Sequence, residues 1–75
     1  MKEYLVEGVV DVKRESANGV VKVEQFGFLR HESAENADAV REKVVRDVTK
    51  KHVRDTKFFK TLGVEFVEVA IYERV

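Results

Sequence analysis

The feature that most constrains this chain is one amphipathic segment, residues 33–54, with the sequence SAENADAVREKVVRDVTKKHVR. Its apolar residues recur at three- and four-residue spacing, which places them on one helix face: Ala37, Val40, Val44 and Val48. The segments on either side alternate between apolar and polar residues, as β-strands do. A 75-residue chain with this pattern predicts a single domain, residues 1–75, in which one helix covers one face of a sheet.

Three segments are predicted to be strands: residues 4–15, 20–31 and 64–74. Residues 55–63 are predicted to form a return loop, with a short strand inside it as an alternative, and Gly63 is predicted to be a turn. In the first strand, alternate residues share one face: Tyr4, Val6, Gly8, Val10 and Val12. This face is therefore expected to pack against the helix.

The dipeptide Asn18-Gly19 predicts a two-residue hairpin turn of type I′, in which both central residues have positive φ. Such a turn would pair Glu15 with Lys22 and Lys13 with Glu24 across the hairpin. Opposite charges in directly facing positions stabilise a pair of strands. The turn and these two charge pairs therefore define the predicted register.

In that register, Phe26 and Phe28 fall on the face opposite to the core face. One extra residue near Gln25, a β-bulge, would bring Phe26 opposite Val12 and Phe28 opposite Val10. The alternative is a regular strand with aromatic residues on both faces. The sequence leaves both open.

The helix is predicted to begin at Ser33 as its N-cap residue, with acidic side chains in the first turn and basic side chains in the last. The elements then follow the order ββαβ, an α+β fold. A crossover through the helix places the third strand beside the first and parallel to the second, in the spatial order 2-1-3. The sheet face without a helix is expected to bind a protein partner or a second copy, through Leu5, Val9, Val20 and Leu29.

No catalytic residues are predicted. The chain has no cysteine, and Ser16 and Ser33 lack the flanking glycines of a nucleophile elbow. His31 and His52 lie at opposite ends of the predicted helix, about 30 Å apart, which is too far to share a metal ion. No glycine-rich phosphate loop follows a strand. We therefore expect no enzyme activity, no metal, no cofactor and no small-molecule substrate.

The chain has no apolar run that approaches the roughly 18 residues of a membrane span, and its first residues lack a signal-peptide pattern. We expect a soluble, cytoplasmic protein that does not bind membranes. The formal net charge is zero, which argues against a protein held to nucleic acid by bulk charge.

The neutral total conceals a basic segment. Residues 41–60 contain eight basic and three acidic residues, a net charge of +5. Four of the basic residues are spaced so that they share one exposed helix face: Lys43, Arg46, Lys50 and Arg54. Three more extend this basic face into the following loop: Lys51, Lys57 and Lys60. The basic face is either a simple solvated surface or a site for phosphates or for an acidic protein.

Phe58 and Phe59 lie among these cations. Aromatic rings between basic groups suit base stacking combined with phosphate contacts. The alternative is that the two rings close the corner between the helix and the last strand, which we expect for at least one of them.

Four short segments carry a resemblance to a known family: residues 4–8 (YLVEG), 37–44, 50–54 (KKHVR) and 64–69. In these segments the chain resembles the archaeal ribosomal protein LX family, small ββαβ domains that lie on large-subunit RNA. This resemblance implies RNA binding by the basic segment after the helix. In architecture alone, the chain is also similar to small phage proteins that bind and inhibit host RNA polymerase.

Two functions are therefore expected as alternatives. The first is a non-catalytic, regulatory or phage-encoded module that docks on a larger macromolecular machine by protein–protein contacts. The second is an RNA-binding protein of ribosomal type that uses the basic end of the helix. The charge balance favours the first, and the segment Lys50-Lys51-His52-Val53-Arg54 favours the second.

Overall fold

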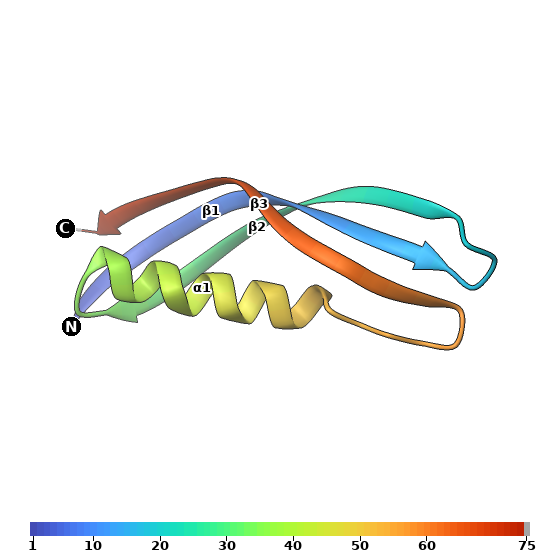
Figure 1. Ribbon diagram of the computed structural model, residues 1–75. Coiled ribbons are helices and arrows are strands. Elements are labelled where there is room, and N and C mark those ends of the chain that lie inside the picture. The colour runs from blue at the N-terminus through green and yellow to red at the C-terminus, as the bar shows by residue number, and fades with distance from the viewer. Residues whose placement is uncertain (75) are drawn as a thin grey trace.

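A computed structural model, which describes residues 1–74, shows three strands and one helix (Figure 1). These are β1 (Lys2–Ser16), β2 (Val21–Ala34), α1 (Ala37–His52) and β3 (Phe59–Arg74). The sheet order is β2-β1-β3, and β1 is antiparallel to both neighbours. The predicted α+β fold, the ββαβ order and the strand order 2-1-3 are therefore confirmed.

The molecule is elongated and measures 50 × 17 × 15 Å. A helix of 16 residues is about 24 Å long, so α1 spans roughly half of the long dimension. It lies along the half of the sheet that contains both chain termini, while the hairpin turn and the start of β3 extend beyond it (Figure 1). We call this uncovered end the distal arm.

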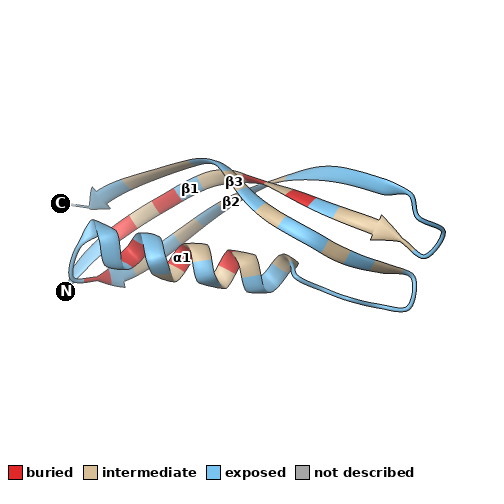
Figure 2. Cartoon of the chain, viewed as in Figure 1, coloured by how far each residue is buried: buried red, intermediate tan, exposed pale blue. Residues whose placement is uncertain are grey.

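The core lies between α1 and the sheet face that it covers (Figure 2). The predicted valines of β1 and of the helix are buried there, whereas Ala37 at the start of α1 is exposed. The core is almost entirely β-branched and small, and its buried members are Tyr4, Val6, Val10, Val12, Ala34, Val40, Val44 and Val48. Half-buried side chains of β2 and β3 surround it.

The hairpin turn differs from the prediction. Ser16 N donates to Val20 O at 2.8 Å and Gly19 N donates to Ser16 O at 2.9 Å, which leaves three residues in the loop. Gly19 has φ +85°, and no non-glycine residue has positive φ among those described, so Asn18 excludes a type I′ turn. The loop is a type I turn followed by a left-handed glycine, the commonest three-residue hairpin connection.

The longer loop shifts the register by one residue. Arg14 faces Lys22, and Lys13 faces Val23, so the predicted Glu15–Lys22 and Lys13–Glu24 pairs do not form. Arg14 instead approaches Glu24, with Nη1 and Oε1 3.7 Å apart. A shift of one residue exchanges the two faces of a strand.

This shift also places the two phenylalanines of β2. Phe26 faces Val10 and Phe28 faces Gly8, and both pack against the core. The pairing of β1 with β2 is continuous, so the bulge near Gln25 was wrong. The bulge is unnecessary because the three-residue turn already brings both rings to the helix side.

The helix begins later than predicted. Ser33 and Ala34 remain in β2, where they face Glu3 and Lys2. The N-cap residue is Asn36, whose Oδ1 accepts a hydrogen bond from Ala39 N at 2.8 Å. Ala34 is buried in the core, and this burial extends the strand past the predicted cap.

The last strand begins earlier than predicted, at Phe59, so only residues 53–58 form the connection after α1. Gly63 lies inside the strand rather than in a turn. The pairing with β1 shifts twice, between Val9 and Val10 and between Lys13 and Arg14. Each shift leaves one extra residue in β3, Val67 and Leu62 respectively, as a β-bulge.

Candidate functional site

The sheet face opposite α1 has no covering element among residues 1–74. We call it the helix-free face. Leu5 and Val9 of β1 lie on it half-buried, and Leu29 of β2 lies on it with 63% of its surface exposed. Tyr72 of β3, which faces Leu5, is 51% exposed. The face therefore presents apolar side chains from all three strands to solvent.

Val20 does not belong to this face, so its predicted placement was wrong. It pairs with Ser16 and has the same parity as Phe26, which points to the helix side. It lines a groove of about 420 Å³ on the distal arm together with Arg14 and Phe59. The cause is the register: the shorter predicted loop assigns Val20 to the wrong face.

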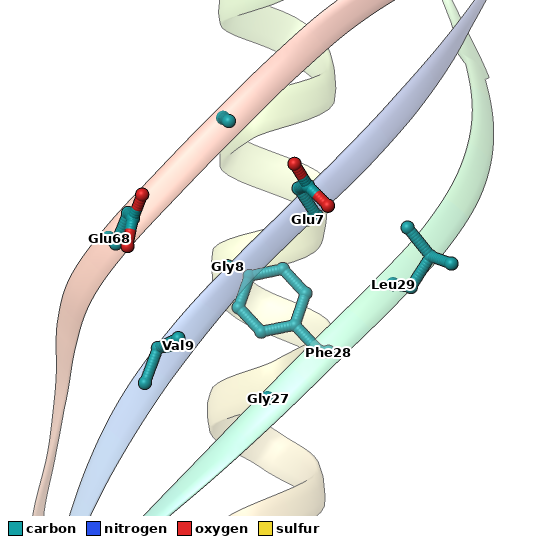
Figure 3. A pocket seen from close by; sticks show the side chains of 8 residues that line it. Glu7, Gly8, Val9, Gly27, Phe28, Leu29 and Glu68 are labelled. Atoms are coloured by element: carbon teal, nitrogen blue, oxygen red, sulfur yellow. The ribbon is translucent and has the colours of Figure 1, made fainter.

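A hollow of about 500 Å³ lies at the centre of the helix-free face (Figure 3). Gly27 leaves space that a side chain would fill, whereas at Gly8 the ring of Phe28 and the backbone of β3 leave no room for a Cβ atom. Glu7 and Glu68 border the hollow on two sides. The hollow thus combines an apolar floor with a carboxylate rim.

The charges of the helix-free face are mainly acidic. The carboxylates on this face outnumber the lysines: Glu7, Asp11, Glu15, Glu65 and Glu68 against Lys13 and Lys60. At the end of the sheet, Glu3 faces Arg74 and their charges cancel. Tyr72 Oη donates to Glu7 Oε1 at 3.2 Å, and this hydrogen bond raises the pKa of the Tyr72 phenol.

The structure divides the predicted basic face into two groups. The first group is neutralised by carboxylates: Lys43 Nζ lies 2.9 Å from Glu32 Oε2, and Arg46 Nε lies 3.7 Å from Asp47 Oδ1. Glu32 also binds Arg30, whose guanidinium reaches Asp47. The hydrogen bond from Lys43 is the largest cause that lowers the pKa of the Glu32 carboxyl.

The second group has no carboxylate within ion-pair distance in the part of the chain that the structure describes. Lys50 and Lys51 lie in the last turn of α1, while Arg54 and Lys57 lie in the connection to β3. Lys60 faces Glu15 and points to the helix-free face, so it leaves the group. The four remaining cations form what we call the cationic end of the helix.

Phe58 and Phe59 have different environments. Phe58 is 66% exposed, and Lys57 Nζ lies 5.2 Å from the centre of its ring. Phe59 is half-buried, with the Arg14 guanidinium 5.4 Å from its ring centre. Phe59 faces Ser16 at the tip of the distal arm and does not join the core, so neither ring closes the corner between helix and strand as expected. Phe58 is accessible for stacking.

One cluster at the end of α1 was not predicted. The His52 ring stacks on Phe26 with ring centres 4.8 Å apart, and Arg14 Nη2 donates to His52 O at 3.4 Å. Burial is the largest cause that lowers the pKa of His52, and the nearby cations Lys51, Arg14 and Arg54 lower it further. The guanidinium of Arg14 complements the negative end of the helix. Only the true register brings these side chains together, so no local sequence signal reveals the cluster.

Within residues 1–74, no group of three His, Cys, Asp or Glu side chains is arranged to hold a metal ion. None of the helices described is long and apolar enough to cross a membrane. Comparison of the chain with protein-family models, curated proteins and solved structures gave no match.

Proposed function

We propose that the protein is a non-catalytic binding module that docks on a partner protein of a larger assembly through its helix-free face. The observation that carries this proposal is the exposed apolar surface around the central hollow, formed by Leu29, Tyr72, Val9 and Leu5. Uncovered apolar surface with a charged border is typical of protein interaction sites.

The charge of this face supports a specific kind of partner. The acidic excess disfavours a second helix-free face as the occupant, because like charges across an interface are costly. It favours an apolar protein surface bordered by lysine or arginine. A basic side chain of such a partner fits the hollow, with its aliphatic stem over Gly27 and its charge between Glu7 and Glu68.

The proposal is tested by photo-crosslinking in extracts of the source cells. A photoreactive phenylalanine analogue is placed at Leu29, on the helix-free face, or at Arg41, on the exposed side of α1, as the matched control. We expect a discrete protein adduct from the Leu29 position that survives nuclease treatment and is lost in a Glu68→Lys background. Equal adducts at both positions, or none at Leu29, would contradict docking by this face.

RNA binding by the cationic end of the helix is the second candidate. It is favoured by the exposed Phe58 ring beside Lys57 and by the lack of acidic partners for Lys50, Lys51 and Arg54 within the described chain. The resemblance to the ribosomal protein LX family points to the same segment. If this candidate is right, RNA affinity falls with salt by a slope of roughly −0.7 per phosphate contact.

Charge reversal separates the two candidates. Lys50→Glu combined with Arg54→Glu should flatten the salt slope by about two contacts if RNA is the ligand, whereas Lys13→Glu on the helix-free face should not. A nuclease-resistant protein adduct that is indifferent to the Lys50/Arg54 reversal supports the first candidate. An RNA affinity that does not change with salt or with the charge reversal would exclude RNA binding by the cationic end of the helix.

A further inference from the structure

The two edges of the sheet differ in how open they are to another strand. The outer edge of β3 is interrupted by the bulges at Val67 and Leu62, and bulges protect sheet edges from further pairing. β2 pairs with β1 without any shift over its whole length, and no strand within residues 1–74 pairs with its other side. A long regular edge is a template for strand addition.

The hairpin shows which residues of β2 present their backbone groups to this open edge. Ser16 and Val20 form a hydrogen-bonded pair, so the even-numbered residues of β2 direct their N–H and C=O groups toward β1. The odd-numbered residues from Val21 to Ser33 therefore direct theirs outward. Gly27 is the central residue of this outward-facing set.

The side chains of β2 are complementary to a second β2 that runs antiparallel, with a two-fold axis through Gly27. Residues whose numbers are equally far from Gly27 then face each other on the helix side: Lys22 with Glu32, Glu24 with Arg30, and Phe26 with Phe28. These are non-hydrogen-bonded pairs, in which side chains approach most closely. Both charge pairs are favourable, and each occurs twice.

Neighbouring registers lose this complementarity. An axis at Phe26 places Lys22 opposite Arg30, and an axis at Phe28 places Glu24 opposite Glu32. Like charges in facing positions destabilise a strand pair. Among these three registers, which all keep both helices on the same side, the charges of β2 favour the axis at Gly27, and it forms four favourable charge pairs.

The structure also has space for the partner's aromatic rings. A groove of about 400 Å³ lies between the edge of β2 and α1, lined by Phe26, Phe28, Val48 and His52 among others. In the Gly27 register, the Phe28 side chain of the second copy lies beside Phe26, at this groove. Aromatic cross-strand pairs are among the most stabilising in sheets.

We propose that a second copy of this chain pairs with the first through β2, antiparallel, with the two-fold axis at Gly27. The product is a six-stranded sheet with both helices on one face. The two β1 strands are then three strand spacings, about 14 Å, apart, and helices need only 8–10 Å between their axes, so the helices do not collide. The two helix-free faces become one continuous surface. The dimer does not depend on which partner this surface binds.

Sedimentation over a range of concentrations tests the dimer. Lys22 is exposed and faces Arg14 within its own chain, so Lys22→Glu removes a repulsion from the monomer while it sets like charges against Glu32 of the second copy. We expect Lys22→Glu to weaken dimerisation about tenfold or more. Lys60→Glu makes the same charge change at the β3 edge and should leave the dimer unchanged.

A cysteine at the axis tests the register. Gly27→Cys, in a chain with no other cysteine, should form an intermolecular disulfide on oxidation, because facing residues there lie about 5.5 Å apart between Cα atoms. Gln25→Cys places the two sulfurs about 13 Å apart along the strand and should not. A strict monomer at high micromolar concentration overturns the proposal. So does a dimer that resists Lys22→Glu, or one in which Gln25→Cys crosslinks as readily as Gly27→Cys.

Discussion

Both faces of the sheet carry aliphatic side chains, but only one face buries them. On the helix side, Val6, Val10 and Val12 of β1 are completely buried under α1. On the helix-free face, Val9 of the same strand is only half-buried, and Leu29 beside it is largely exposed. Valine and leucine therefore stabilise the fold on one face and remain available for contacts on the other.

This difference follows from the number of elements. A chain with one helix can bury one sheet face, and strands of such a sheet normally carry apolar residues on the covered face and polar residues on the other. Apolar residues on the uncovered face therefore need another explanation. An apolar second face adds little to folding stability because water still reaches it. We attribute its apolar residues to binding.

The largest expected loss of stability is at Gly8, in the central strand, where β2 and β3 both approach β1 closely. A Cβ atom at this position would overlap Glu68 O and lie 2.7 Å from Phe28 Cζ, so β1 and β3 would have to separate. Gly8→Ala should lower the free energy of unfolding by about 3 kcal/mol or more, measured in urea. Gly27→Ala is the control, because the nearest atom to its new Cβ lies at 3.9 Å. Equal costs at the two positions would contradict the close packing over Gly8.

The second effect tests the helix-side core. Val44 is fully buried in α1, and its neighbour Val45 is half-buried. Val44→Ala should cost about 2–3 kcal/mol of unfolding free energy, since it leaves a cavity that the small core cannot refill. Val45→Ala should cost less than half of this. Similar costs, measured by urea unfolding, would mean that α1 is rotated from the described orientation.

The third effect concerns the start of the helix. Asn36 accepts a hydrogen bond from Ala39 N, and Ser33 lies in β2. Asn36→Ala should therefore lower the free energy of unfolding by about 1 kcal/mol, and Ser33→Ala should leave it nearly unchanged. A larger loss of unfolding free energy for Ser33→Ala than for Asn36→Ala would show that the helix begins at Ser33, as expected from the sequence.

The fourth and smallest effect is a pH dependence from His52. Burial and nearby cations lower its pKa below the ordinary value of 6.5, so the unfolded chain binds this proton more readily than the folded one. Stability from His52 is fully present above pH 6.5 and decreases as the pH falls toward the folded-state pKa. Thermal unfolding above the titration range of carboxylates should show this slope, and His52→Gln should remove it. A stability that rises as the pH falls would mean that His52 gains a proton on folding.

Periodicity was sufficient to predict the order of elements, the strand order and the core valines. It failed at the turn, because Asn18-Gly19 suits both a two-residue and a three-residue loop, and only the latter leaves Asn18 with negative φ. That one residue changed the face assigned to Val20 and made a bulge near Gln25 seem necessary. Two-fold alternation amplifies an error of one residue into an exchange of faces.

Sequence periodicity predicted part of the candidate site, namely the apolar residues of the helix-free face. Leu5 and Val9 follow from alternation alone, whereas Leu29 was assigned to the helix-free face only through the bulge near Gln25. The structure places all three on the helix-free face. The predicted basic face is not one continuous basic surface in the structure, because Glu32 in β2 forms an ion pair with Lys43 in α1. Contacts between distant segments of this kind depend on how the helix crosses the sheet, which periodicity does not encode.

The most direct test compares Val9 and Val10, neighbours in β1 that point to opposite faces. Threonine matches valine in shape but carries a hydroxyl group that must be hydrated or bonded. Val10→Thr should lower the free energy of unfolding by about 1–3 kcal/mol, because its hydroxyl is buried in the core. Val9→Thr should change it by no more than about 0.5 kcal/mol, because water reaches the helix-free face. Equal losses for the two variants would show that the helix-free face is already covered in the free protein and is not available for docking.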